Sequence, residues 1–218
     1  MQNYFRRWRL AHDDFSVRVF FASHRIRLTQ ALALPVVLAI ALTHSAWVER
    51  SRAVAVGLFV SGLALTSIAI IGRLWCAIYI SGYKTRSLIA AGPYSIMRHP
   101  FYFFSLVGSV GVGLTTQTLT IPLVFLFIFA LLYPMVMRRE EQALLSQHGD
   151  AYQDYAARVP RFWPNLKLLA EPERYEVFPL VLRRRLSDSL WFILAVGLVK
   201  LLEALRDAGV LATLWRVY

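Results

Sequence analysis

The chain of 218 residues is 57% hydrophobic and only 17% charged, whereas about 25% of residues in soluble proteins are charged. So few charges cannot cover the surface of a water-soluble domain. The composition therefore excludes a water-soluble protein and predicts an all-α integral membrane protein. The net charge is +11, but the arginines are spread along the chain rather than gathered on one module. This distribution argues against nucleic acid as a partner.

The first predicted element is an arginine-rich lead-in that ends at Arg27. It also contains Asp13 and Asp14, and no convincing cleavage pattern follows the apolar run behind it, so it is interpreted as retained rather than as a signal peptide. Residues 28–43 carry no charge and predict a first membrane span, and residues 53–72 predict a second.

The next stretch, from Pro100 to Met137, contains no aspartate, glutamate, lysine or arginine. One helix of that length would extend about 57 Å, nearly two bilayers. The polar segment at 115–120 lies near its middle, so a helical hairpin at about 101–137 is predicted. Several glycines can let helices either pack closely or part: Gly57, Gly62, Gly108, Gly111 and Gly113.

Residues 189–199 form a short apolar run that fits two interpretations, a membrane span or a helix lying along the membrane surface. The total is therefore four to five transmembrane helices. Three units follow along the chain: two helices with their lead-in at 1–72, a core at 73–165, and a basic C-terminal segment at 166–218. The single Cys76 excludes an internal disulfide and a multi-cysteine metal site, and no metal site is predicted.

Arginine and lysine are concentrated in the N-terminal lead-in and in the segments 73–100 and 138–188. The positive-inside rule places these three segments in the cytoplasm and the tip of the hairpin on the other side. The protein is accordingly predicted to lie in a bacterial inner membrane, with anionic membrane lipid as one of its partners.

Two polar clusters flank the predicted hairpin at this cytoplasmic level. In the first, a Gly92-Pro93 turn is followed by Arg98 and His99, and Pro100 suits the first turn of the helix behind them. The second contains Glu140 and Glu141, which either are neutralised by the preceding arginines or face the Arg98 region to bind a cation. Behind it, Asp150 is expected to cap a short helix on which Tyr152, Tyr155 and Val159 share a face.

Taken in order, these motifs resemble those of the isoprenylcysteine carboxyl methyltransferase and phospholipid methyltransferase family of integral membrane enzymes. The matching residues are Gly92-Pro93-Tyr94, Arg98-His99-Pro100-Phe101-Tyr102, Glu140-Glu141, Gly149-x-x-Tyr152-x-x-Tyr155 and Arg161-x-x-Pro164, and they cover about residues 72–165. The resemblance implies S-adenosylmethionine as the cofactor, bound on the cytoplasmic side between the Arg-His-Pro and Glu-Glu segments. The chain departs from the family at Phe103, where a small residue is frequent, and this substitution is expected to narrow the pocket.

Under this resemblance the residues take specific roles. Arg98 or His99 is expected to hold the cofactor's carboxylate, and Glu140 or Glu141 its ammonium. The predicted cofactor-binding set is Gly92, Pro93, Tyr94, Arg98, His99, Tyr102, Glu140, Glu141 and Tyr155, and the predicted catalytic residues are Arg98 and Glu140.

The predicted function is methyl transfer to a lipophilic acceptor at the cytoplasmic face: a small isoprenoid acid, a prenylated cysteine carboxylate or a lipid head group. Two alternatives remain open at this stage. One is an NADPH-dependent membrane reductase of the sterol-reductase type, which shares an Arg-His-Pro element, and the other is a non-enzymatic membrane protein of the same fold. The identity of the acceptor atom and the oligomeric state are left open by the sequence.

Overall fold

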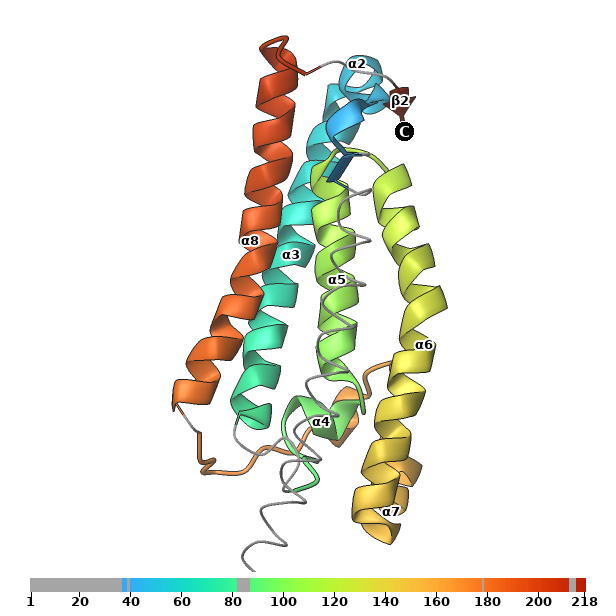
Figure 1. Ribbon diagram of the computed structural model, residues 1–218, viewed down its shortest axis with the longest axis vertical. Coiled ribbons are helices and arrows are strands. Elements are labelled where there is room, and N and C mark those ends of the chain that lie inside the picture. The colour runs from blue at the N-terminus through green and yellow to red at the C-terminus, as the bar shows by residue number, and fades with distance from the viewer. Residues whose placement is uncertain (1–36, 39, 82–86, 178, 212–214) are drawn as a thin grey trace, which may run out of the picture.

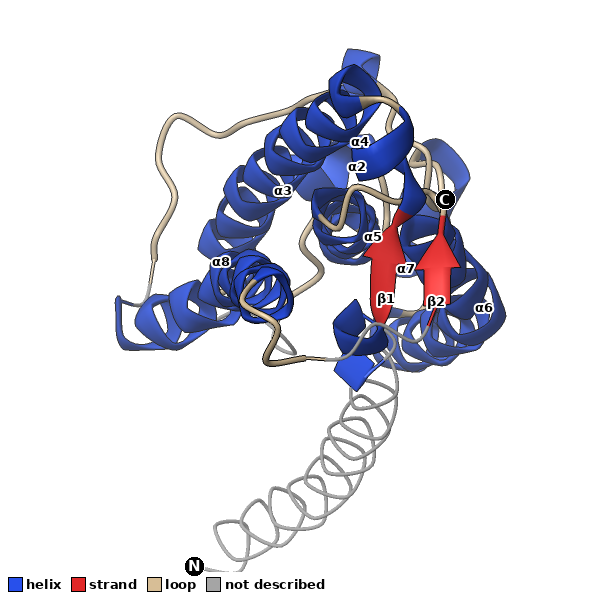
Figure 2. Cartoon of the chain, turned by 90° about the horizontal axis from the view of Figure 1, so that it is seen from above, coloured by secondary structure: helices blue, strands red, loops and turns tan. Residues whose placement is uncertain are grey.

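The computed structural model describes residues 37–38, 40–81, 87–177, 179–211 and 215–218. Its elements in chain order are β1 (Thr43–Ser45), α2 (Ala46–Arg50), α3 (Arg52–Ile80), α4 (Pro93–Ile96), α5 (Pro100–Thr115), α6 (Thr120–His148), α7 (Asp150–Arg158), the 3-10 helix η1 (Leu166–Leu168), α8 (Pro179–Asp207) and β2 (Trp215–Val217). The long helices α3, α5, α6 and α8 form an elongated bundle (Figure 1). In the view from above, α5 lies between α3 and α8 on one side and α6 on the other (Figure 2).

Two of the described helices, α3 and α6, are long and apolar enough to cross a membrane. Helix α5 is also apolar, but its 16 residues span only about 24 Å. The predicted count of four to five spans is therefore reduced to two candidates by length and composition within the described residues. The first predicted span, at 28–43, falls largely outside them.

The predicted hairpin is confirmed: α5 ends at Thr115 and α6 begins at Thr120. However, α6 continues beyond the predicted boundary at Met137 and ends only at His148. Glu140 and Glu141 therefore lie within a continuous helix, about two turns before its C-terminal end. The part of α6 beyond the apolar stretch forms a wall of the site described below.

The apolar run at 189–199 proves to be part of the 29-residue helix α8. This helix runs alongside α3 for most of its length (Figure 1), which favours its place in the bundle over a position across the bundle's end. Arg73 of α3 joins three helices, because its Nη1 donates to Ser105 of α5 at 2.5 Å and its guanidinium lies over Phe101 of α5 and Phe192 of α8, at 4.1 and 5.4 Å.

Small residues bring α3 and α5 into close contact. A Cβ atom added to Gly62 would lie 2.6 Å from the carbonyl oxygen of Gly111, and one added to Gly111 would lie 2.6 Å from Thr66 Oγ1. Thr66 itself donates to the Gly62 carbonyl at 2.8 Å, so its buried hydroxyl is satisfied. Close packing is thus the role of these glycines, whereas Gly57 has nothing within 4 Å of an added Cβ.

The described residues are mostly helical, as predicted, but the end of the bundle away from α4 and α7 also contains a short parallel strand pair that was not predicted. In it β1 pairs with β2, with His44 opposite Arg216. The segment that follows β2 reaches the start of α6, where the Tyr218 carbonyl accepts hydrogen bonds from the N–H groups of Leu119 and Thr120 at 2.9 and 2.8 Å. These backbone groups at the start of a helix otherwise have no intrahelical partner, so the contact stabilises the hairpin tip.

We expect Gly111→Ala to lower the apparent melting temperature of the detergent-solubilised protein by roughly 3–10 °C. The added methyl group has no room between α3 and α5, and overpacking of this kind costs about 1–3 kcal/mol. Gly57→Ala is the matched control, because it adds the same group to α3 in open space and is expected to leave the melting temperature within about 2 °C. Equal melting temperatures for the two variants would contradict the close α3–α5 packing.

Candidate functional site

The Gly92-Pro93 turn lies at the α4 end of the bundle and is held from outside by the segment that follows α7. Gly92 has φ +58° and ψ −130°, a backbone conformation that residues other than glycine rarely adopt. A Cβ atom at this position would lie 2.4 Å from the Tyr79 ring. Its N–H donates to the Ala170 carbonyl at 2.8 Å, and the Ala170 N–H donates to Ser95 Oγ at 3.0 Å. Gly92 and the fully buried Pro93 therefore shape the turn.

The same segment fixes Arg98 from behind. The Arg98 N–H donates to the Pro160 carbonyl at 2.8 Å, and the Asn165 N–H donates to the Ile96 carbonyl at 2.9 Å. His99 is the N-cap residue of α5, with Pro100 in the first helical position, as the sequence predicts. These backbone hydrogen bonds therefore fix the backbone from which the Arg98 and His99 side chains extend.

Glu141 is the centre of an ionic cluster that joins three segments. Its Oε1 accepts from Arg98 Nη1 at 3.2 Å, from His99 Nε2 at 3.1 Å and from Arg161 Nε at 3.0 Å. Arg161 Nη2 also lies 2.9 Å from the other carboxylate oxygen. The side chain of Glu141 is only 17% exposed, so these contacts take the place of hydration. Of the two interpretations of the acidic pair, the inward-facing one holds for Glu141, and the cations it binds are the protein's own.

Glu140 occupies a different position from its neighbour. Its Oε2 lies 3.7 Å from Nδ1 of His99, so the buried His99 ring has a carboxylate at each nitrogen. The contact between Nε2 and Glu141, at 3.1 Å, is within hydrogen-bond distance, whereas the 3.7 Å contact between Nδ1 and Glu140 is too long for a hydrogen bond. The Glu140 side chain is 35% exposed, which makes it the more accessible of the two carboxylates.

Helix α7 closes the site from the side, and its buried face is the one predicted, with Tyr152, Tyr155 and Val159 packed together. Asp150 is the first residue of α7 and makes no side-chain cap, which corrects the expectation for it; Gly149, at φ +54°, is the N-cap residue. Tyr155 donates its hydroxyl to the Tyr94 carbonyl at 2.8 Å.

Burial controls the titration of both α7 tyrosines. It raises the pKa of Tyr155 well above its ordinary value. Burial also raises the pKa of Tyr152, an effect that the nearby Arg98 guanidinium partly offsets. The Tyr152 hydroxyl lies near this guanidinium without a hydrogen bond of normal geometry. Both phenols are therefore neutral near pH 7, and Tyr155 acts as a hydrogen-bond donor rather than as a base.

These elements surround a cavity of about 210 Å³. Five predicted residues line it: Tyr94, Arg98, His99, Glu140 and Tyr155. Four others are not in its wall: Gly92, Pro93, Tyr102 and Glu141. The volume lies below the 300–1,000 Å³ usual for small-molecule sites, and the wall includes Ser87, which follows the stretch 82–86 outside the described residues.

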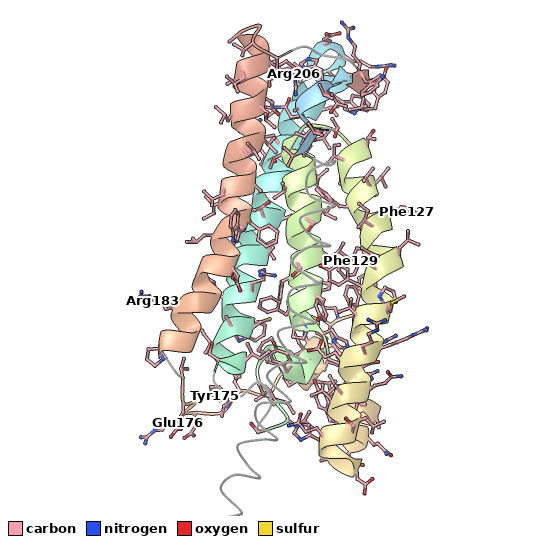
Figure 3. All side chains as sticks on the ribbon, viewed as in Figure 1. Phe127, Phe129, Tyr175, Glu176, Arg183 and Arg206 are labelled. Carbon is pink, nitrogen blue, oxygen red and sulfur yellow. The ribbon has the colours of Figure 1, made fainter. Side chains whose placement is uncertain are left out.

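Tyr102 belongs instead to an aromatic cluster on the other side of the ionic cluster. Its ring centroid is 5.3 Å from that of Tyr133, and Tyr133 stacks on Phe129 at 3.9 Å. Phe103, which was expected to narrow the pocket, packs here against Phe162, with centroids 5.7 Å apart. The side-chain view shows Phe129 between α5 and α6, whereas Phe127 points away from the bundle (Figure 3).

Several residues of the site were not predicted to be part of it. Arg161 and Tyr152 were recognised only as motif positions, and Leu144, Gln147 and His148 not at all. A signal was available for the last three, because positions 144, 147 and 148 follow Glu140 at helical spacing once α6 is extended to its true end.

The sequence is similar to known proteins over most of its length. The profile of a family described as phospholipid methyltransferase matches residues 51–151, which include α3, α5 and α6. The nickel-cobalt-cadmium resistance protein NccN of Alcaligenes xylosoxydans xylosoxydans is 38% identical over 89% of this chain and 90% of its own. The cobalt-zinc-cadmium resistance protein CzcN of Cupriavidus metallidurans is 37% identical over 88% of each chain. No solved structure matches the chain.

We expect Glu141→Gln to lower the melting temperature in detergent by about 5–10 °C. Removing the charge leaves Arg98 and Arg161 facing each other in a half-buried site, which costs on the order of 2–4 kcal/mol. Glu140→Gln is the matched control, and its greater exposure limits its effect to about 2 °C. A Glu141→Gln protein as stable as the Glu140→Gln protein would contradict the central position of Glu141.

Proposed function

The chain belongs to the phospholipid methyltransferase family, and we propose that it transfers the methyl group of S-adenosylmethionine to a lipophilic acceptor at the membrane surface. The observation that carries the proposal is the juxtaposition of Arg98, His99 and Glu140 in the wall of one cavity, although the chain separates them by a helical hairpin.

The residues of the cavity fit a zwitterionic nucleoside. Glu140 offers a half-exposed carboxylate for an ammonium group. Arg98 offers a guanidinium whose Nε is buried without a hydrogen-bond partner among the described residues, which suits a carboxylate. The start of α5 at Pro100 adds the positive potential of a helix N-terminus beside them.

The sequence left open which of the two glutamates binds the ammonium group of the cofactor, and in this proposal the two have different roles. Glu141 holds Arg98 and His99 in place through its own contacts, whereas Glu140 binds the ammonium. Arg98 is positioned twice, by the Glu141 carboxylate and by the backbone hydrogen bond to Pro160, so little of its side-chain freedom remains to be lost on binding.

When bound, S-adenosylmethionine supplies an activated methyl group next to a positively charged sulfur. The protein's part is to orient the reactants and to exclude water, which together lower the barrier by up to about 7–11 kcal/mol. The wall of the cavity is largely apolar away from Arg98 and Glu140, with Ile80, Leu88 and Leu144 in it. A dry wall favours a transfer in which opposite charges cancel.

A carboxylate acceptor is already ionised near pH 7 and needs no base, whereas an amine acceptor must lose a proton. Glu140 and His99 are the candidate bases in the second case, since both line the cavity. We favour a carboxylate or a similar anionic acceptor, with Arg98 orienting it. Its apolar part is proposed to lie along the aromatic cluster of α5, α6 and the 161–163 segment, on the side of the ionic cluster away from the cavity.

Binding of S-adenosylhomocysteine is the direct test. We expect the purified protein to bind it and not NADPH. Glu140→Gln is expected to weaken binding by about tenfold or more, because it removes a charged contact worth roughly 1.5–3 kcal/mol. His99→Ala is expected to weaken binding as well, because it removes a lining residue that contacts both glutamates. NADPH binding without S-adenosylhomocysteine binding would favour the reductase alternative. Failure to bind either ligand would favour a non-enzymatic role.

The same ligand tests the orientation. With the cavity proposed to face the cytoplasm of a bacterial inner membrane, sealed inside-out vesicles are expected to bind S-adenosylhomocysteine from the medium. Right-side-out vesicles are expected to bind it only after they are permeabilised. Equal binding by both preparations before permeabilisation would be inconsistent with one cytoplasmic site.

The names of the two relatives connect this family branch with resistance to nickel, cobalt, zinc and cadmium. We propose that this chain contributes to tolerance of such metals through its methylated product. Cells that lack the gene are then expected to grow less well in cobalt or cadmium, and a plasmid copy is expected to restore growth, whereas a Glu140→Gln copy made in equal amount is not. Full rescue by Glu140→Gln would separate metal tolerance from methyl transfer.

A further inference from the structure

The part of the cavity wall that α6 forms carries different polar side chains at its two ends. Glu140 lies at one end and His148 at the other, two turns apart, or about 12 Å at 1.5 Å per residue. Arg98 and His99 gather at the Glu140 end, as their shared contacts with the two glutamates require. At the other end α6 contributes Gln147 and His148.

His148 carries a buried polar atom that the rest of the site does not explain. Its Nε2 is inaccessible to solvent and has no hydrogen-bond partner among the described residues. Leaving such a group unpaired costs about 1–3 kcal/mol, so buried ring nitrogens normally have a partner. Because His148 lines the cavity, a ligand in the cavity is the natural source of that partner.

We infer that His148 binds the purine ring of the nucleoside, at the end of the cavity away from Arg98 and Glu140. This inference rests on the proposed function, which supplies a ligand with a charged amino-acid tail at one end and an uncharged purine at the other. The tail pairs with Arg98 and Glu140 because charge-assisted hydrogen bonds are the strongest available to it. The purine is then left for the end of the wall at Gln147 and His148, which lies away from Arg98 and Glu140.

The chemistry of this end matches a purine edge. Adenine carries an amino donor and ring-nitrogen acceptors, and a neutral imidazole offers either a donor or an acceptor at Nε2. Leu88 and Leu144 supply the apolar surface that a purine face requires, and the Tyr152 and Tyr155 rings line the same cavity. His148 is thus assigned as a cofactor-binding residue that reads the base, whereas Arg98 and Glu140 read the tail.

Two probes separate the two ends. S-Adenosylhomocysteine contains both parts, and 5′-methylthioadenosine keeps the purine but lacks the amino-acid tail. We expect His148→Phe, which keeps an aromatic ring and removes both nitrogens, to weaken both ligands by a similar factor of about 5 to 20. Glu140→Gln is expected to weaken S-adenosylhomocysteine alone.

Two further variants serve as controls. His148→Gln restores a hydrogen-bonding group and is expected to bind both probes within about threefold of the unaltered protein. Gln142→Leu removes a polar group from an exposed position of α6 outside the cavity wall and is expected to change neither affinity. Melting temperatures of all variants show whether each is folded before its affinity is compared.

The outcomes are distinct. Unchanged affinities in His148→Phe, or a loss confined to S-adenosylhomocysteine, would overturn the assignment of His148 while leaving the methyltransferase proposal intact. If His148→Phe does not fold, His148→Leu, which also removes both ring nitrogens, replaces it: a loss of similar size for both probes together with a normal melting temperature supports the assignment, and unchanged affinities or a loss for S-adenosylhomocysteine alone overturn it. If the unaltered protein binds neither probe, the proposed function fails and the assignment fails with it.

Discussion

The arrangement of the site depends on one carboxylate. Glu141 accepts hydrogen bonds from Arg98, His99 and Arg161, which come from the start of α5 and from the segment behind α7. Without that charge the two guanidinium groups would repel each other across a half-buried space. Because Glu141 belongs to α6, the ionic cluster also fixes the distance between the two arms of the hairpin at this end. The cavity and the aromatic cluster lie on either side of it.

Helix geometry explains why two consecutive glutamates serve different purposes. Neighbouring positions on an α-helix are turned by about 100°, so two adjacent side chains leave the helix in different directions. With Glu141 directed at the arginines, Glu140 is turned to the edge of the cavity, where it contacts the other nitrogen of His99 and stays accessible. Glu141 joins the segments of the site, and Glu140 is the more exposed of the two acids. The two adjacent glutamates in the sequence do not reveal which of them contacts the arginines, because the direction of each side chain depends on how α6 packs against α5.

The sequence predicted what depends on local chemistry and missed what depends on distant partners. The hairpin followed from an uncharged stretch too long for one helix, and the two polar clusters from motifs at its ends. A short helix was predicted at 189–199, but the full length of α8 was not, because its apolar run is short. The charged Lys200 beyond this run is accommodated by Phe59 of α3, 4.1 Å away. The strand pair was missed because its two strands, Thr43–Ser45 and Trp215–Val217, come from distant parts of the chain. The Gly92-Pro93 turn was found from the sequence, but the need for glycine at position 92 follows from its positive φ and from the Tyr79 ring beside it, which only the structure shows.

Arg98 is the residue through which the two sides of the site communicate. It lines the cavity, and it shares Glu141 with Arg161, whose neighbour Phe162 lies against Phe103 and Phe129 of the aromatic cluster. In the proposed reaction, the nucleoside would bind on the cavity side of this group of charges and the apolar part of the acceptor on the side of the aromatic cluster. Because each charge in this group already has a partner within the protein, the guanidinium does not need to reorganise when a reaction begins. Such preorganisation is what a transfer between two oppositely charged groups requires of its surroundings.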